Sequence, residues 1–106
     1  MMKAFFCGNV ANDPELRGKD KNVLTFNVAV NTRQKNENGE WVEKHQFFPF
    51  VMFGNRAKAI GEFLRKGAGV TIEAVPNQNT WEDEKGKHSS IEFIVDDIRV
   101  DAKRTA

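Results

Sequence analysis

The stretch of residues 46–54 constrains the fold of this chain more than any other. It holds four of the nine phenylalanines, and its length and closing glycine favour a β-strand over a helix. Alternate side chains of a strand point to opposite faces, so one face carries Phe47, Pro49, Val51 and Phe53, and the other carries Phe48, Phe50 and Met52. A small domain has one interior, so only one of these apolar faces can be core. The other face has to meet a subunit, a ligand or another layer of the protein.

A length of 106 residues fits one domain, residues 1–106, with a core that needs no metal or disulfide. The only cysteine, Cys7, cannot form a disulfide within the chain, which favours a reducing, cytoplasmic location. The sequence has no apolar run of membrane-spanning length and no signal-peptide pattern. We therefore expect a soluble protein that contacts no membrane and carries no metal or cofactor.

The net charge of +1 falls short of the basic balance that is typical of nucleic-acid-binding domains. The charge is unevenly distributed, however. Residues 47–67 carry four basic side chains against one acidic, whereas residues 68–106 carry five basic against eight acidic. An anion is therefore expected to bind nearer the middle of the chain than its end.

Four further segments have the pattern of β-strands. Residues 23–31 alternate apolar and polar side chains, as a half-buried strand does. Residues 3–7, 70–81 and 91–100 are the other extended segments. Proline cannot donate a hydrogen bond to a sheet, so Pro49 and Pro76 each predict an edge, a bulge or a bend.

Two polar stretches are predicted to form projecting hairpins. The first spans residues 33–46 and turns at Asn38-Gly39, and the second spans residues 81–87 with Gly86 near its tip. Trp41 stands in the middle of the first hairpin, where few neighbours could bury it. Contact with something outside the fold therefore explains Trp41 better than packing does.

One amphipathic helix is predicted, over residues 56–66. Its apolar stripe consists of Ala57, Ile60, Phe63 and Leu64. Three strands, one helix and two strands is the order of an OB-fold: all-β, a five-stranded Greek-key barrel with one α-helix between strands 3 and 4. The expected buried set is Phe26, Val28, Phe48, Phe50, Met52, Ile60, Phe63, Leu64, Ile72, Phe93 and Ile98.

Several short motifs follow one another along nearly the whole chain. They are MKAFFCGNV at 2–10, DPELR at 13–17, NGEW at 38–41, VMFG at 51–54, FLRKG at 63–67, WED at 81–83 and VDDI at 95–98. In this order they resemble the start, the first arm, the third strand with its helix, and the last hairpin of bacterial single-stranded DNA-binding proteins. Each motif alone is weak, but together they form a specific signal for that family.

The resemblance implies a homo-oligomer, a dimer or a tetramer, that binds single-stranded DNA without strong sequence preference and protects it in replication, recombination or repair. It implies stacking of bases on Phe47, Phe53 and Trp81, and backbone contacts from Arg17 and Lys66. Aromatic faces accept any base, and long basic side chains follow the phosphates. The arms and the basic middle of the chain supply the other candidates: Trp41, Arg33, Lys35, Arg56, Lys85 and Lys87.

Some positions depart from the family pattern. Arg33-Gln34 stands where an aromatic residue is usual, Phe47 replaces a tryptophan and Pro49 replaces a frequent arginine. These changes predict weaker binding than a typical member has. Most members also end in a long tail that recruits other proteins. Only six residues follow the last predicted strand, so either a tail has been removed from this sequence or the chain is a tailless member, and we expect no tail-mediated recruitment.

Three other function classes can be compared with the sequence. An enzyme is disfavoured because His45 and His88 are far apart in the sequence and Cys7 has no partner at metal-ligand spacing. A primosomal or replication-accessory OB protein would also bind single strands. An OB module that only docks another protein would use the phenylalanine-rich face for apolar contact, and its affinity would not fall with salt as that of a strand binder does.

Overall fold

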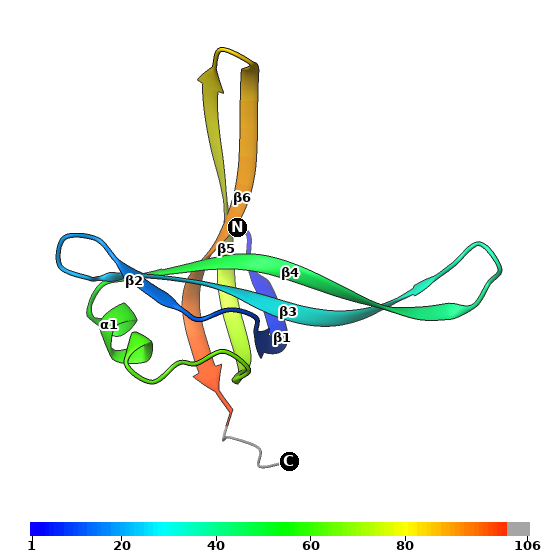
Figure 1. The fold of residues 1–106 in the computed structure, drawn as a ribbon, viewed down its shortest axis with the longest axis horizontal. Helices are drawn as coiled ribbons and strands as arrows, with labels where there is room; N and C mark the ends of the chain where they lie inside the picture. The colour runs from blue at the N-terminus through cyan, green and yellow to red at the C-terminus, as the bar shows by residue number, and fades with distance from the viewer. Residues whose placement is uncertain (102–106) are drawn as a thin grey trace.

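The protein, described as a computed structural model over residues 1–101, is a small β-barrel with two long arms (Figure 1). Its elements are β1 (Ala4–Val10), β2 (Glu15–Arg17), β3 (Val23–Lys35), β4 (Trp41–Phe53), α1 (Asn55–Gly61), β5 (Gly69–Asp83) and β6 (Gly86–Val100). The expected absence of a C-terminal tail falls on residues 102–106, which lie outside the described part of the chain. None of the helices within residues 1–101 is long and apolar enough to cross a membrane.

The barrel is closed by five strands, as the sequence predicted. The sheet order is β1-β5-β6-β4-β3-β2, and a further antiparallel pairing of β1 with β3 joins the sheet into a ring. Strand β2 only adds three residues beside β3. Helix α1 follows β4, the third of the five barrel strands, which confirms the OB-fold. Gly8 is required where β1 crosses β3, since a Cβ there would lie 2.3 Å from the carbonyl oxygen of Ala29.

Helix α1 is shorter than predicted. It ends at Gly61, whereas the apolar stripe predicted a helix over residues 56–66. Beyond the helix the chain bonds to β1, with the Gly67 amide donating to the Val10 carbonyl at 2.8 Å and the Val10 amide donating to the Ala68 carbonyl at 2.9 Å. These tertiary bonds override the helical pattern.

The core lies inside the barrel and contains most of the expected residues. The predicted members that are buried are Phe26, Val28, Phe50, Met52, Leu64, Ile72 and Ile98. Phe48, Ile60 and Phe93 are half-buried and pack against this core. Phe63 is a wrong prediction: it is 54% exposed, because the helix ends before it and its neighbour Leu64 fills the interior instead.

The two arms are the outer halves of hairpins β3–β4 and β5–β6 (Figure 1). Neither proline forms a bulge, because Pro49 pairs with Asn27 in register and Pro76 pairs with Phe93. Each lies on a strand edge, one of the predicted alternatives, since β6 pairs with β4 only at Phe50 and Val51 and β1 pairs with β5 only as far as Ala74. Asn27 directs its backbone away from β4, donating to Asn12 Oδ1 and accepting from the Ala11 amide. Pro49 therefore occupies a pair that needs no donor. The register shift of β5 lies at Glu73/Ala74 instead.

Candidate nucleic-acid interface

Three of the four predicted aromatic residues share one face of β4. The β3–β4 pairing runs from Trp41 to Phe53 without a register shift, so side chains two residues apart lie on the same face. Trp41, Phe47 and Phe53 are 59%, 64% and 55% exposed, whereas Phe50 and Met52, on the other face, are buried in the barrel. We call the exposed side, carrying Trp41, Phe47 and Phe53, the outer face.

Three predicted cations lie on the outer face, and one of them pairs directly across the strands with an aromatic residue. Lys35 is the partner of Trp41, and its Nζ lies 5.3 Å from the centre of the Trp41 ring. Arg33 lies two pairs nearer the barrel, opposite Glu43, and therefore on the same face. Arg17 of β2 pairs with Val23, which pairs in turn with Phe53. The register thus brings Arg17, Arg33 and Lys35 to the outer face.

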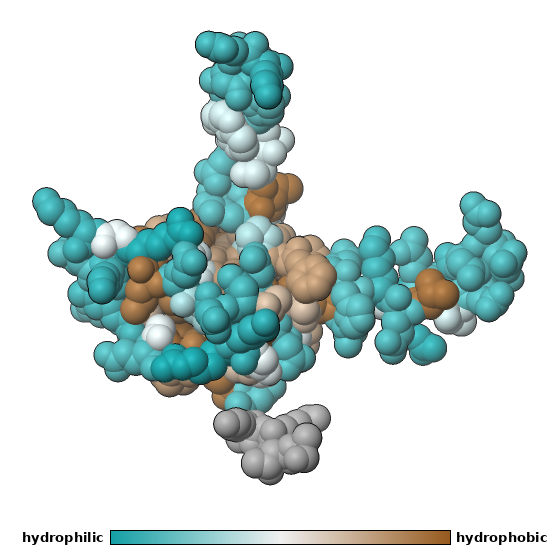
Figure 2. Space-filling model, in the orientation of Figure 1, coloured by the Kyte–Doolittle hydropathy of each residue, from teal (hydrophilic) through white to brown (hydrophobic). Residues whose placement is uncertain are grey.

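Trp81 lies on the continuation of this face in the second arm. Val51, between Pro49 and Phe53, pairs with Ile94 of β6, and Ile94 pairs with Val75 of β5. Trp81 has the same strand parity as Val75, with no register shift between them. Hydrophobic side chains gather over the barrel and the roots of the arms, while most of each arm is hydrophilic (Figure 2).

His88 is a part of this region that the sequence analysis missed. Its ring stacks on Trp81, with centroids 5.5 Å apart and an interplanar angle of 26°. His88 Nε2 lies 2.9 Å from Asp83 Oδ1, which also accepts a hydrogen bond from the Lys85 amide. One face of Trp81 is therefore covered by the imidazole. This pair could have been predicted from the position of the turn. If Asp83 and Gly86 are the last paired residues of the hairpin, the residues two positions further along each strand, Trp81 and His88, are partners.

The remaining predicted cations lie elsewhere. Lys87 pairs with Glu82, so its strand parity places it opposite Trp81 on the second arm, and Lys85 lies in the turn at its tip. Lys66 lies in the loop between α1 and β5 and lines a separate cavity there. The structure therefore does not gather Lys66, Lys85 and Lys87 beside the aromatic residues of β4.

Two of the predicted cations already contact carboxylates. Arg17 Nη2 lies 2.6 Å from Glu15 Oε2 on β2, and Arg56 Nη2 lies 2.6 Å from Asp97 Oδ1 on β6. Arg56 also donates to the carbonyl oxygen of Asp96 at 2.8 Å, so it ties α1 to β6. An exposed ion pair is weak and exchangeable, which leaves Arg17 able to move to a phosphate. Arg56 has two partners on β6, so its role is better described as stabilising the fold than as binding a phosphate.

The contact with Arg56 sets a pH dependence. The hydrogen bond from Arg56 holds the pKa of Asp97 below its usual 3.8. Such a carboxylate stabilises the fold fully above 3.8, and this contribution is lost as the pH falls through the lower folded-state value. We expect Asp97→Asn to lower the melting temperature at neutral pH and to converge with the wild type in strong acid. Glu37→Gln, on the first arm, is the control, and an equal difference at both pH values would contradict the expectation.

No group of three or more His, Cys, Asp or Glu side chains within residues 1–101 is arranged to hold a metal ion. The arrangement consists of exposed aromatic rings with basic side chains beside them.

Residues 1–101 match the single-strand binding protein family. The chain belongs to that family.

Known members of the single-strand binding protein family support this assignment. The chain is 32% identical to the single-stranded DNA-binding protein of Aquifex aeolicus, over 92% of this chain and 68% of the relative. It is 33% identical to the mitochondrial single-stranded DNA-binding protein of Drosophila melanogaster, over 86% of this chain and 64% of the relative. The chain thus spans about two thirds of the length of these relatives.

The fold also matches solved structures of the single-strand binding protein family. The structure titled Plasmodium falciparum SSB complex with ssDNA superposes with a TM-score of 0.83 at 21% identity, over 96% of both chains. At this level of identity the likeness concerns the fold.

Proposed function

We propose that this protein binds single-stranded DNA without strong sequence preference and protects it in replication, recombination or repair. The observation that carries the proposal is the outer face, on which Trp41, Phe47 and Phe53 are exposed along one strand. Packing in the core does not explain these rings, because more than half of each side chain is exposed. Membership of the single-strand binding protein family supports the same function. The role is binding, with no catalytic step.

The physical argument has two parts. Bases stack on exposed aromatic rings for about 1–3 kcal/mol each, whatever their sequence. Phosphates are attracted most by basic side chains that are not already paired with a carboxylate. Arg33 and Lys35 form no ion pair within residues 1–101. The outer face supplies both groups side by side, so a strand could lie along β3 and β4 with bases on the rings and phosphates at the edge.

A fluorescence titration tests the function. The chain has two tryptophans, and both are proposed contacts, so oligo-thymidine should quench their emission. Affinity should fall with rising salt, with a slope of log K against log salt of about −0.7 for each phosphate neutralised. A duplex of the same length serves as the control. Salt-independent affinity for a protein partner, with no response to oligo-thymidine, would favour a protein-docking module instead.

Self-association through β1 is the second part of the proposal. Residues 4–8 of β1 pair with β5 on one side, while β3 reaches only Asn9 and Val10. The edge along residues 4–8 thus has backbone groups that could pair with a second copy, and Phe5 beside it is exposed. We expect light scattering to give a dimer or a tetramer at micromolar concentration. A mass of 12.0 kDa would contradict this expectation.

The cytoplasm is the proposed location, supported by the single cysteine in the sequence. The Drosophila relative is named a mitochondrial protein, so the reducing interior of a bacterium and that of an organelle are both compatible with the fold. Expression of a fluorescent fusion in the source cell would separate the two.

A further inference from the structure

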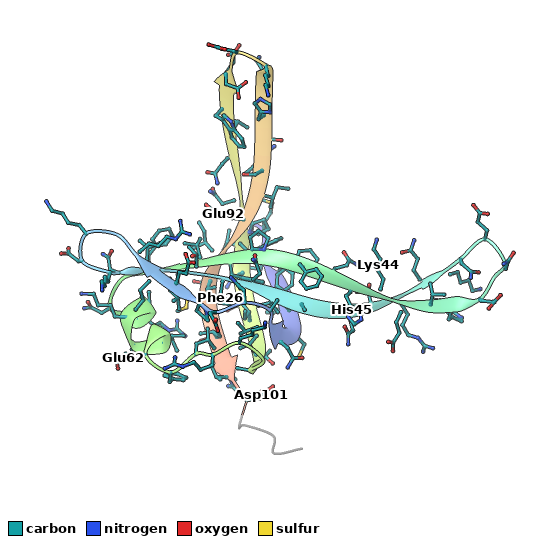
Figure 3. The ribbon with its side chains drawn as sticks, in the orientation of Figure 1. Phe26, Lys44, His45, Glu62, Glu92 and Asp101 are labelled. Carbon is teal, nitrogen blue, oxygen red and sulfur yellow. The ribbon has the colours of Figure 1, made fainter. Side chains whose placement is uncertain are left out.

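Phe63 is an exposed aromatic residue that neither the core nor the outer face uses. It lies in the loop between α1 and β5 and is 54% exposed. Its side chain lines an open cavity of about 880 Å³, whose other walls include Asn9 of β1, Lys66 of the loop and Asp101 after β6. We call this the loop cavity. Glu62 and Asp101 mark two corners of this end of the barrel, near α1 and near the end of β6 (Figure 3).

The loop that carries Phe63 is held in place by several contacts. Leu64, the next residue, is buried in the core. The guanidinium of Arg65 donates to the carbonyl oxygens of Leu64 and Glu62, each at 3.0 Å. Asn9 Nδ2 donates to the carbonyl oxygen of Gly67 at 3.1 Å, which fixes the loop to β1. The ring of Phe63 is therefore presented by an ordered segment, so little ordering is needed before it can bind.

A short path joins the loop cavity to the outer face. Phe47 of β4 pairs with Ala29 of β3, and Ala29 pairs with Asn9 of β1. Cross-strand partners lie side by side on the same face of a sheet, and neighbouring strands are about 4.8 Å apart. Phe47 and Asn9 are thus separated by about 10 Å of surface, and the side chain between them is a single methyl group. A strand leaving Phe47 would meet the cavity wall at Asn9.

The charges around the loop cavity indicate along which wall the backbone of a bound DNA strand would run. Lys66 lines the cavity and makes no ion pair within residues 1–101. Asp101 lines it as well and would repel a phosphate. The backbone of a bound strand should therefore keep to the Lys66 side. The guanidinium of Arg65 is occupied by carbonyl oxygens, so Lys66 is the cation available for a phosphate.

We propose that the loop cavity is a second nucleotide-binding subsite, in which Phe63 stacks a base of the strand that runs from Phe47 past Asn9. Lys66, for which the family resemblance already implies a backbone contact, lies beside this base on the cavity wall. This inference rests on the proposed function, since the strand has to be held on the outer face first. It extends the contact surface from the arms to the opposite end of the barrel. The ligand is a single-stranded oligonucleotide longer than the outer face alone can hold.

The test is a length series of oligo-thymidine, from about 4 to about 16 nucleotides, the range of site sizes for one OB-fold. The wild type should gain affinity in a step once the oligomer is long enough to reach Phe63. Phe63→Ala should remove that step, a loss of about 5- to 150-fold for one stacked base. Affinity for the shortest oligomers that bind should not change. Lys66→Ala should flatten the salt slope for long oligomers only.

Matched variants separate stacking from other roles of Phe63. Phe63→Trp should keep the step, while Phe63→Leu, which is apolar but has no ring, should lose it. Ile91→Ala is the control, because Ile91 is 55% exposed and lies on the second arm, outside the outer face and the loop cavity. Melting curves of all variants check that each is folded at the titration temperature.

The outcomes are distinguishable. A length step that survives in Phe63→Ala would overturn the subsite and leave the outer face intact. A change in mass of Phe63→Ala without DNA would assign the ring to a contact between copies of the chain, and would also overturn the subsite. If the wild type binds no oligomer of any length, the proposed function and the subsite both fail.

Discussion

Phe50→Ala is expected to lower the free energy of unfolding by about 3–5 kcal/mol, the usual cost of removing a large buried ring. Phe50 is 2% exposed at the centre of the barrel. Its ring centre lies 5.0 Å from that of Phe6, 5.7 Å from that of Phe26 and 5.6 Å from that of Phe93. The alanine variant would leave a cavity between β1, β3, β4 and β6, and these strands cannot move together to fill it because they are hydrogen-bonded in the closed barrel. Chemical denaturation of the two proteins measures the difference.

Phe50→Leu is the control, and it should cost less because it keeps most of the apolar volume. The loss expected for alanine is a large fraction of the stability of a small domain, so the variant is best studied at low temperature and low denaturant. A loss for Phe50→Ala no larger than that for the exposed Phe53→Ala would contradict the assignment of the two faces of β4.

Phe53→Ala is expected to weaken binding of oligo-thymidine by about 1–3 kcal/mol, the value of one stacked base. Phe53 is 55% exposed on the outer face, at the end of β4. Stacking releases no counterions, so the slope of affinity against salt should stay the same. The melting temperature should change little, because the ring is outside the core. Titrations at two or more salt concentrations, with a melting curve of the same sample, provide both numbers.

The opposite result has a clear meaning. If Phe53→Ala melts at a much lower temperature, while its folded fraction binds with wild-type affinity, Phe53 is a packing residue and the outer face loses one of its three aromatic residues. Val42→Ala, on the opposite face of the same strand and also exposed, is the matched control. It should leave both the affinity and the melting temperature near those of the wild type.

The strands and the two faces of β4 could be predicted from the sequence because both depend on local alternation. The polar–apolar pattern of residues 23–31 and the phenylalanines of residues 46–54 assign each side chain to a face without reference to the rest of the chain. The pairing of β3 with β4 then keeps that assignment past Pro49. The turn signals of the two hairpins were equally local, and both hairpins are present.

The end of the helix and the position of Phe63 could not be predicted in this way. A periodic apolar stripe continues to residue 64, but the loop exchanges hydrogen bonds with Val10, more than fifty residues earlier in the chain. The pairing of Arg56 with Asp97 has the same character, since it joins α1 to β6 across forty-one positions. The sequence identifies Arg56 as a cation, but it does not show which carboxylate pairs with it in the fold.

The candidate site was predictable in composition and less so in arrangement. Trp41, Phe47 and Phe53 lie on one face because they are separated by even numbers of residues in one strand. Lys87 has the opposite strand parity from Trp81, and this could have been read from the turn at Lys85-Gly86. The distance of Lys66 from the arms depends on the closure of the barrel, which no local pattern contains.

Photocross-linking tests the central claim, that the outer face carries the single strand. Oligo-thymidine containing 5-iodouracil would be irradiated in complex with the wild-type protein, and the modified residues identified by mass spectrometry of peptides. The account predicts adducts on Phe47, Phe53 and the tryptophans of the two arms, suppressed by unlabelled single strands and not by a duplex. Adducts confined to Phe5, Val42 or Ile91, with the outer face unmodified, would contradict it.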